Sequence, residues 1–128
     1  MTASVVLDAS AILAVARGER GSEIVAEHIF KSLTCAVNLT EVVSRLLDFG
    51  APVDEIGPRL SRLTAQIAPF DRDLALEAGL LRDATRHKGL SLGDRACLAL
   101  AMREKLPAMT ADTAWSDLDL GVEVVLIR

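Results

Sequence analysis

The feature that most constrains the fold of this chain is a series of short apolar runs, each ended by polar residues and followed by a helical pattern. The apolar runs cover residues 4–7, 34–37, 65–70, 106–110 and 122–127. The helical patterns cover residues 10–16, 22–31, 38–49, 54–63, 71–86 and 92–104. Short apolar runs of this kind are typical of buried parallel strands. Because they alternate with helices, the sequence predicts an α/β/α sandwich with a central parallel sheet of about five strands.

The length and the distribution of apolar residues predict a single soluble domain. The chain has 128 residues, enough to bury one sizeable core, so we expect one domain over residues 1–128. No apolar run approaches the roughly 18 residues that a membrane helix needs. Residues 1–4 carry no basic flank of the kind that precedes a signal peptide core. We therefore expect a cytoplasmic protein with no membrane partner.

The cysteines, the histidines and the net charge exclude several classes of function. Cys35 and Cys97 are 62 positions apart in apolar surroundings, which fits neither a disulfide framework nor a zinc site. His28 and His87 are isolated from each other and from any hydroxyl or thiol motif. The net charge of −4 disfavours a surface devoted to phosphate binding but allows a local basic rim.

Four carboxylates stand where predicted strands end or predicted helices begin. They are Asp8, Glu41, Asp94 and Asp112. The carboxyl ends of parallel strands lie along one edge of a sheet, where such folds place their sites. The four acids are therefore predicted to meet at that edge.

Each acid also has a purely structural explanation as a helix cap. Glu41 and Asp94 stand three residues after Asn38 and Ser91, which is the spacing of a capping box, and the other two acids can cap the turns that follow them. Two facing carboxylates 4 Å apart, however, repel by about 4 kcal/mol at an effective dielectric constant of 20. Helix dipoles offset only about 0.3–1 kcal/mol per acid. Capping alone does not explain the gathering of four acids, whereas a divalent cation such as Mg²⁺ or Mn²⁺ does.

A bound divalent ion would allow hydrolysis of a phosphodiester without a histidine or a cysteine. Such an ion lowers the pKa of a bound water and stabilises charge on the leaving oxygen. The chain has no tyrosine, and its sequence offers no Ser–His pairing as a nucleophile. Metal-assisted phosphodiester hydrolysis is the mechanism for which the sequence has the residues.

Four segments around these acids resemble the successive motifs of the PIN-domain family, in particular its VapC-type toxins. The segments are VLDASA at residues 6–11, NLTEV at 38–42, LGDRACLALA at 92–101 and TAD at 110–112. They occur in the family's order and span nearly the whole chain. The resemblance implies a single PIN domain with a PIN-like sandwich, and a metal-dependent endoribonuclease that is the toxin component of a VapBC toxin–antitoxin pair.

The resemblance also implies roles for individual residues. Asp8, Glu41, Asp94 and Asp112 would be the catalytic acids that bind one or two Mg²⁺ or Mn²⁺ ions. Asp117 is an alternative to Asp112 as the fourth acid, and we favour Asp112. Ser10 and Thr110 correspond to hydroxyls that flank the acids. Arg17, Arg20, Arg45 and Arg95 are candidates for phosphate contact, and Arg95, beside Asp94, is favoured, with a surface or salt-bridged arginine as its alternative.

The implied partners are RNA, an antitoxin and a second copy of the chain. The RNA would be a single-strand-accessible part of transfer or ribosomal RNA. The antitoxin would be of the VapB type, with a segment in an apolar groove and a basic side chain among the acids, where it would compete with the metal. A homodimer is also implied.

Other interpretations were weighed against this one. A haloacid-dehalogenase phosphatase needs a second aspartate where this chain has Ser10. A receiver domain needs an acidic pair near the first strand and a lysine after a late strand, whereas Lys105 ends a helix. No glycine-rich turn follows the first strand, which disfavours dinucleotide binding. The remaining alternative is a catalytically silent PIN-fold protein that binds a partner.

Overall fold

The computed structural model describes residues 2–128 and confirms the predicted fold class. Met1, where the predicted domain begins, lies outside the described residues. The elements in order are β1 (Val5–Leu7), α1 (Ala9–Arg17), α2 (Ser22–Ala26), η1 (Ile29–Lys31), β2 (Ser32–Cys35), α3 (Ala36–Asp48), α4 (Val53–Ser61), β3 (Gln66–Ala68), α5 (Arg72–Thr85), η2 (Arg86–Lys88), α6 (Leu92–Glu104), β4 (Ala108–Thr110), η3 (Thr113–Trp115) and β5 (Val124–Leu126). None of the helices within residues 2–128 is long and apolar enough to cross a membrane.

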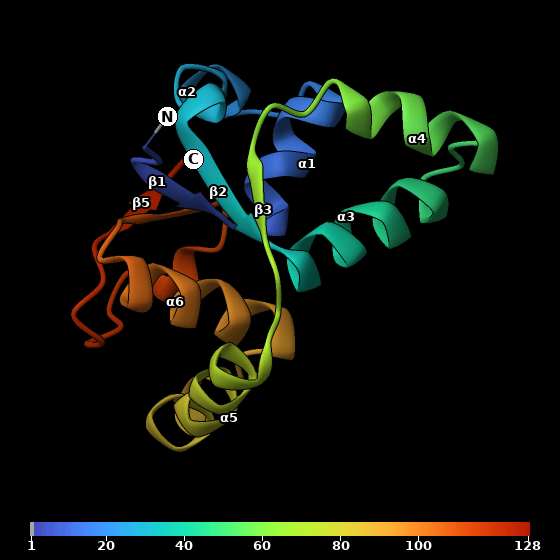
Figure 1. The fold of residues 1–128 in the computed structure, drawn as a ribbon. Coiled ribbons are helices and arrows are strands. Elements are labelled where there is room, and N and C mark those ends of the chain that lie inside the picture. Colours follow the sequence, from blue (N-terminus) through green and yellow to red (C-terminus); the bar gives the residue numbers. More distant parts are fainter. Residues whose placement is uncertain (1) are drawn as a thin grey trace.

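The five strands form one parallel sheet in the order β3-β2-β1-β4-β5 (Figure 1). The chain extends the sheet from β1 to β2 and β3 on one side, and then adds β4 and β5 on the other side of β1. The direction of growth therefore reverses at β1 and β4. In open parallel sheets such a reversal leaves a crevice at the carboxyl ends of the strands, and ligands bind there.

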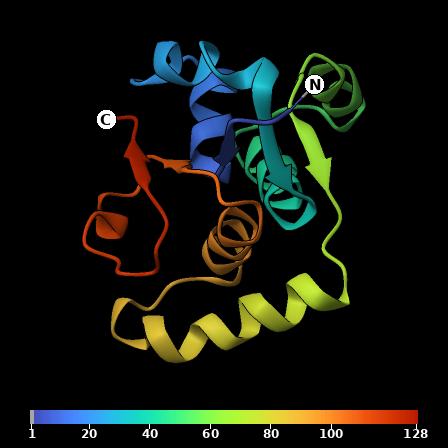
Figure 2. The ribbon, with the colours of Figure 1, turned by 60° about the vertical axis from the view of Figure 1, so that its left-hand side comes forward.

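Alternating side chains of β1 face two separate layers of helices. Val5 and Leu7 pack in one core with α1 and α3, whereas Val6 packs in the other core with α5 and α6. Figure 2 shows α6 between the sheet and α5, and α1, α2, α3 and α4 on the opposite face. Because α6 is covered on both sides, residues 96–101 are all buried. Residues at the start of α6 are thus held firmly against the end of the sheet.

The sequence predicted the elements well and some of their boundaries poorly. Residues 92–104 form the predicted helix, and Ser91 caps it as its capping-box spacing predicts. Asp71, the first residue of the helical pattern at 71–86, is the N-cap of α5. The predicted helix over residues 22–31 is wrong, because it is divided into α2 and η1. The predicted strand at residues 34–37 lies two residues earlier, so Cys35 is the N-cap of α3 and the prediction that Asn38 caps this helix is wrong.

Candidate active site

A cleft of about 320 Å³ lies at the carboxyl ends of β1 and β4. It is lined by the four predicted acids, which are Asp8, Glu41, Asp94 and Asp112. The structure therefore brings together four carboxylates from four separate segments of the chain. A fifth acid that the sequence did not predict, Glu19, lines the same cleft, together with the basic residues Arg45 and Arg128 and the aromatic residue Phe49.

Asp8 is the most buried of these acids and is held by two hydroxyl groups. It follows β1, and its side chain is only 5% exposed. Ser10 Oγ and Thr110 Oγ1 both donate hydrogen bonds to Asp8 Oδ2, at 2.8 and 2.9 Å. Asp8 occupies the N-cap position of α1 but makes no side-chain capping hydrogen bond to it. Helix capping is therefore not the reason for an aspartate at this position.

The same two hydroxyls join the end of β1 to the segment after β4. Ser10 Oγ accepts from the Ala111 backbone N–H at 2.9 Å, and Thr110 Oγ1 accepts from the Asp112 N–H at 3.1 Å. The two hydroxyl oxygens are 3.2 Å apart. This network fixes the backbone that carries Asp112 relative to Asp8. Asp112 also caps η3, because its Oδ1 accepts from the Ala114 N–H at 3.0 Å.

Glu41 lies against α6 through Asn38 and Gly93. Asn38 Nδ2 donates to Glu41 Oε1 at 3.1 Å and to the Gly93 carbonyl oxygen at 3.0 Å. Asn38 is fully buried, and its Oδ1 has no hydrogen-bond partner among residues 2–128. A Cβ at Gly93 would overlap the Glu41 carboxylate. The missing side chain at Gly93 is therefore what allows Glu41 to lie beside the start of α6.

Asp94 serves the helix as well as the cleft. The Ser91 hydroxyl accepts from the Asp94 N–H at 3.1 Å, and Asp94 Oδ2 accepts from the Ser91 N–H at 3.0 Å. This arrangement is the capping box that the sequence predicts here. One oxygen of the Asp94 carboxylate is thus committed to the backbone of α6.

Burial and mutual repulsion raise the pKa of two of the acids. Desolvation is the main cause of the raised pKa of Asp8, and the nearby Asp94 charge adds to it, while the hydrogen bonds from Ser10 and Thr110 oppose it. Desolvation also raises the pKa of Glu41, with further contributions from Asp8 and Asp94 that the hydrogen bond from Asn38 partly offsets. The Asp94 charge thus disfavours the ionised forms of both Asp8 and Glu41.

The acids do not form a ready-made cage for an ion. Among the described residues 2–128, no group of three or more Asp, Glu, His or Cys side chains is placed to hold a metal. The bonds from Asp94 to the Ser91 backbone and from Asp112 to the Ala114 backbone account for part of this spread. The predicted gathering of the acids is therefore present as a shared cleft and not as a compact ligand set.

The remaining candidate residues lie in different places. Asp117 does not line the cleft: its side chain is 68% exposed and pairs with Lys88. Arg95 donates from Nη1 to the Ala78 carbonyl of α5 at 3.1 Å, because neighbouring residues of a helix point in different directions and Arg95 faces away from Asp94. Arg17 lies outside the acid cleft and stacks on Phe49, at its edge.

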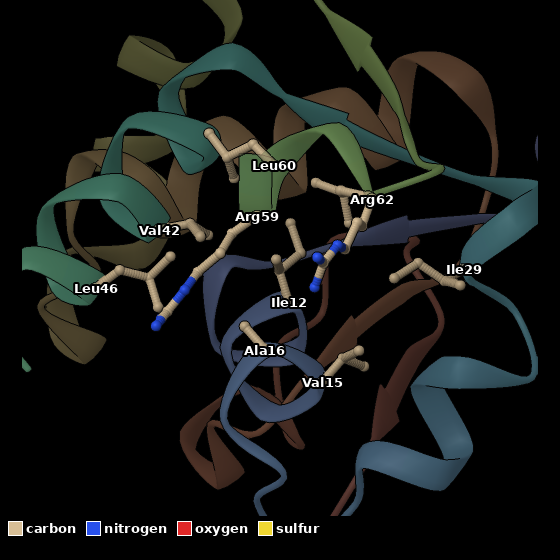
Figure 3. A pocket seen from close by; sticks show the side chains of 10 residues that line it. Ile12, Val15, Ala16, Ile29, Val42, Leu46, Arg59, Leu60 and Arg62 are labelled. Carbon is tan, nitrogen blue, oxygen red and sulfur yellow. The ribbon is translucent and has the colours of Figure 1, made fainter. Parts of the chain in front are cut away.

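A second hollow, also of about 320 Å³, lies between α1, α3 and α4 (Figure 3). Most of its lining is apolar and includes Ile12, Val42 and Leu46. Figure 3 shows Arg59 extending into the space between α1 and α3, and Arg62 lying between Ile12 and Ile29. A smaller hollow shares Leu46 and Arg59 with this groove and shares Phe49 with the acid cleft, so the three hollows adjoin along one side of the molecule.

Sequence reasoning missed several residues around the cleft. Asn38 was read as a cap, and the roles of Gly93, Phe49 and Arg128 were not recognised. For Phe49 a signal was available, because Glu41, Arg45 and Phe49 are spaced by four residues and so share one face of a helix. No local pattern reveals Gly93 or Arg128, since their neighbours come from distant segments.

Comparison with known proteins identifies the family. The model of the PIN domain family matches residues 5–120, and the chain therefore belongs to this family. No curated protein matches the chain at a significant level.

Solved structures share the fold along almost the whole chain. The DNA-bound VapBC complex of Salmonella typhimurium superimposes with a TM-score of 0.79 at 14% identity, covering 99% of this chain and 100% of the other. VapBC-5 of Mycobacterium tuberculosis gives 0.64 at 25% identity, covering 97% and 98%. VapC20 of the same organism, described as a sarcin–ricin-loop-cleaving toxin, gives 0.73 at 19% identity, covering 88% and 93%.

The raised pKa of Asp8 predicts how stability depends on pH in the absence of metal. Its folded-state pKa lies above the ordinary value of 3.8, so its stabilising contribution is present below that value and is lost as the pH rises through the folded-state pKa. In EDTA, Asp8→Asn is expected to have a higher Tm than wild type at pH 7, and the difference is expected to shrink towards pH 4. Thermal unfolding across this pH range measures it.

Asp117→Asn is the matched control for this measurement, because the Lys88 hydrogen bond lowers the pKa of Asp117 and reverses the expected sign. A higher Tm for Asp117→Asn at neutral pH, or a lower one for Asp8→Asn, would contradict the account of the two environments.

The overlap at Gly93 predicts that Gly93→Ala moves Glu41 without unfolding the chain. Alanine favours a helix over glycine by about 1 kcal/mol, and the overlapping atoms belong to the end of a flexible side chain. Stability should therefore change by no more than about 1 kcal/mol. Glu41 should move towards solvent, and its pKa should fall towards the ordinary value, as carboxyl NMR titration can measure.

Gly79→Ala in α5 is the control, since a Cβ there meets nothing within 4 Å. An unchanged titration of Glu41 in Gly93→Ala would show that Gly93 does not set its position.

Proposed function

We propose that this protein is a metal-dependent endoribonuclease and the toxin component of a VapBC toxin–antitoxin pair. The observation that carries the proposal is the buried Asp8 carboxylate at the reversal point of the sheet, with four further acids around the same cleft. Family membership and the shared fold of VapBC proteins support it. The reaction would be hydrolysis of an RNA phosphodiester bond.

The donor set fits Mg²⁺ or Mn²⁺ better than it fits softer ions. All four acids offer hard oxygen ligands, and neither cysteine lines the cleft. Mg²⁺ commonly uses one or two protein carboxylates together with waters and substrate phosphates, so it does not need a cage of three. Asp8 would hold the ion together with Glu41 or Asp94, the two acids whose charges interact with its own. Asp112 would lie at the edge of the ion site. When bound, the ion would supply a water of lowered pKa and stabilise the leaving oxygen.

The residues of the chain would position the substrate and keep the acids ionised. The hydroxyls of Ser10 and Thr110 favour the charged form of Asp8 and oppose the effect of its burial. Arg45 and Arg128 lie in the same cleft and carry the bidentate donors that suit a phosphate. RNA is the proposed substrate, and the structural similarity to VapC20, described as a sarcin–ricin-loop-cleaving toxin, supports it. A transfer or ribosomal RNA loop would present unpaired nucleotides to the cleft.

The apolar groove between α1, α3 and α4 is the proposed site of a VapB-type antitoxin. Its floor of Ile12, Val42 and Leu46 suits the apolar face of a peptide. The hollows that connect it to the acids would let the peptide place a basic side chain among them. A homodimer and cytoplasmic location stay predictions from the resemblance and the composition.

A second candidate function is a catalytically silent PIN-fold protein that binds a partner. Two of the four predicted acids serve the backbone, because Asp94 accepts from the Ser91 N–H and Asp112 accepts from the Ala114 N–H, and a purely structural role would explain both. This second function differs from the first proposal in requiring neither metal nor RNA cleavage.

A cleavage assay on the purified chain, free of antitoxin, distinguishes these functions. We expect RNA cleavage that requires Mg²⁺ or Mn²⁺ and falls by at least about 100-fold in Asp8→Asn and Asp94→Asn, since an acid that orients the ion or its water contributes on the order of 10²–10⁴-fold. Asp117→Asn is the matched control and should cleave normally, because Asp117 lies outside the cleft. Equal cleavage by all four proteins would refute the site, and no cleavage by wild type under any metal condition would favour the silent alternative.

The antitoxin proposal predicts that metal and antitoxin compete. The toxin resemblance implies a short reading frame beside the gene. The chain would be co-expressed with the product of such a reading frame, and the Kd of the complex would be measured in EDTA and in Mn²⁺. We expect Mn²⁺ to weaken the complex and Leu60→Glu, in the groove, to abolish it. Leu76→Glu on α5, where the leucine is 61% exposed, is the control. A complex indifferent to Mn²⁺ and to Leu60→Glu would contradict this site.

A further inference from the structure

One face of α3 carries three different chemical groups at intervals of one helical turn. Glu41, Arg45 and Phe49 are four residues apart, and all three line the acid cleft. At 1.5 Å per residue, each step advances about 6 Å along the helix axis. Along this face the Glu41 carboxylate, next to the other acids, is followed by the Arg45 guanidinium and then by the Phe49 ring at the end of the helix.

Phe49 is an exposed aromatic ring between two arginines. The ring is 45% exposed at the C-cap of α3, although a phenylalanine with no partner would normally be buried. The Arg17 guanidinium carbon lies 3.4 Å from the ring centroid, and that of Arg45 lies 5.0 Å from it. Both contacts fall within the range of cation–π interactions.

The two arginines are held differently. Arg17 is fixed by its ion pair with Glu19 at 2.8 Å as well as by close stacking on the ring. The Arg45 side chain makes no hydrogen bond or ion pair within residues 2–128, and its guanidinium lies farther from the ring. The Arg45 side chain is therefore the one that can turn towards a bound phosphate. Its movement would expose more of the Phe49 ring to another planar group.

We propose that Phe49 stacks an unpaired base of the RNA substrate, with Arg45 contacting an adjacent phosphate and Arg17 backing the ring. The inference rests on the proposed nuclease function and names residues that position its substrate. A π-face stacks on any base, and single-stranded nucleic acid is bound by combining such faces with positive charge. The two guanidinium groups beside the ring favour an anionic partner such as RNA over an apolar peptide.

The chain offers a matched control in Phe30. This ring is 49% exposed and has Lys31 Nζ at 5.8 Å from its centroid, but it does not line the acid cleft. Phe30→Ala therefore removes an aromatic ring of similar exposure with a neighbouring cation, at a position away from the proposed RNA path.

The test measures binding of a fluorescent single-stranded oligoribonucleotide to the full chain in EDTA, where cleavage is blocked. Phe49→Ala is expected to weaken binding at least about fivefold, which is the lower bound for loss of one base stack, and Phe49→Trp to restore it. Arg45→Ala should reduce the slope of log K against log salt by about 0.7, the value for one phosphate contact on a single strand, whereas Phe49→Ala should leave the slope unchanged. Arg45→Lys should keep the slope.

With Mn²⁺ present, Phe49→Ala should raise KM more than it lowers kcat, and Phe30→Ala should alter neither. Binding by Phe49→Ala equal to that by Phe30→Ala, in a preparation whose wild type cleaves RNA, would overturn this inference and leave the nuclease proposal standing. Weakened antitoxin binding with unchanged RNA binding would also overturn it, by assigning the ring to the protein partner. A wild type that binds RNA through Phe49 but does not cleave it would refute the nuclease proposal alone.

Discussion

The structure depends on keeping the Asp8 carboxylate buried at the one point where the sheet changes direction. Desolvation of a carboxylate is costly, and the nearby Asp94 charge adds repulsion. Two hydroxyl donors from different ends of the chain, Ser10 and Thr110, offset part of that cost. The same donors hold the end of β1 to the segment after β4. The group that destabilises the cleft is thus also the centre of the network that fixes its shape.

The fold was predictable because its signals are local. Each strand lies in or beside a short, mostly apolar run of sequence. Ser91 and Asp94, three residues apart, mark the start of α6 by the spacing of a capping box. Asn38 misled the prediction because an N-cap residue and a buried amide look alike in sequence. Only the approach of Gly93 from a distant helix shows that Asn38 bridges two elements. The boundary of α3 was set instead by Cys35, whose buried strand ends directly in the helix.

The candidate site was predictable in membership and not in geometry. Asp8 and Asp112 follow neighbouring parallel strands, so strand order places both at the carboxyl edge of the sheet. Glu41 and Asp94 reach the same edge because they lie near the starts of α3 and α6. The distances between the four carboxylates depend on which of their oxygens accept backbone hydrogen bonds. In Asp112, for example, the turn at η3 places the Ala114 N–H against Oδ1. The basic residues followed the same rule: Arg95 adjoins Asp94 in sequence yet faces α5, whereas Arg45 reaches the cleft from another helix. Proximity along the chain predicts little about proximity around a site.

The enclosure of α6 between the sheet and α5 has a consequence for motion. Amide hydrogens in an element covered on both sides exchange mainly when the whole molecule opens, whereas exposed helix ends fray far more often. Asp94 is anchored by its capping box at the start of this enclosed helix, and Phe49 lies at the exposed end of α3. The wall of the cleft formed by the start of α6 is therefore more rigid than the wall formed by the C-terminal end of α3. The α3 wall can adjust to differently shaped loops while the acids keep their positions.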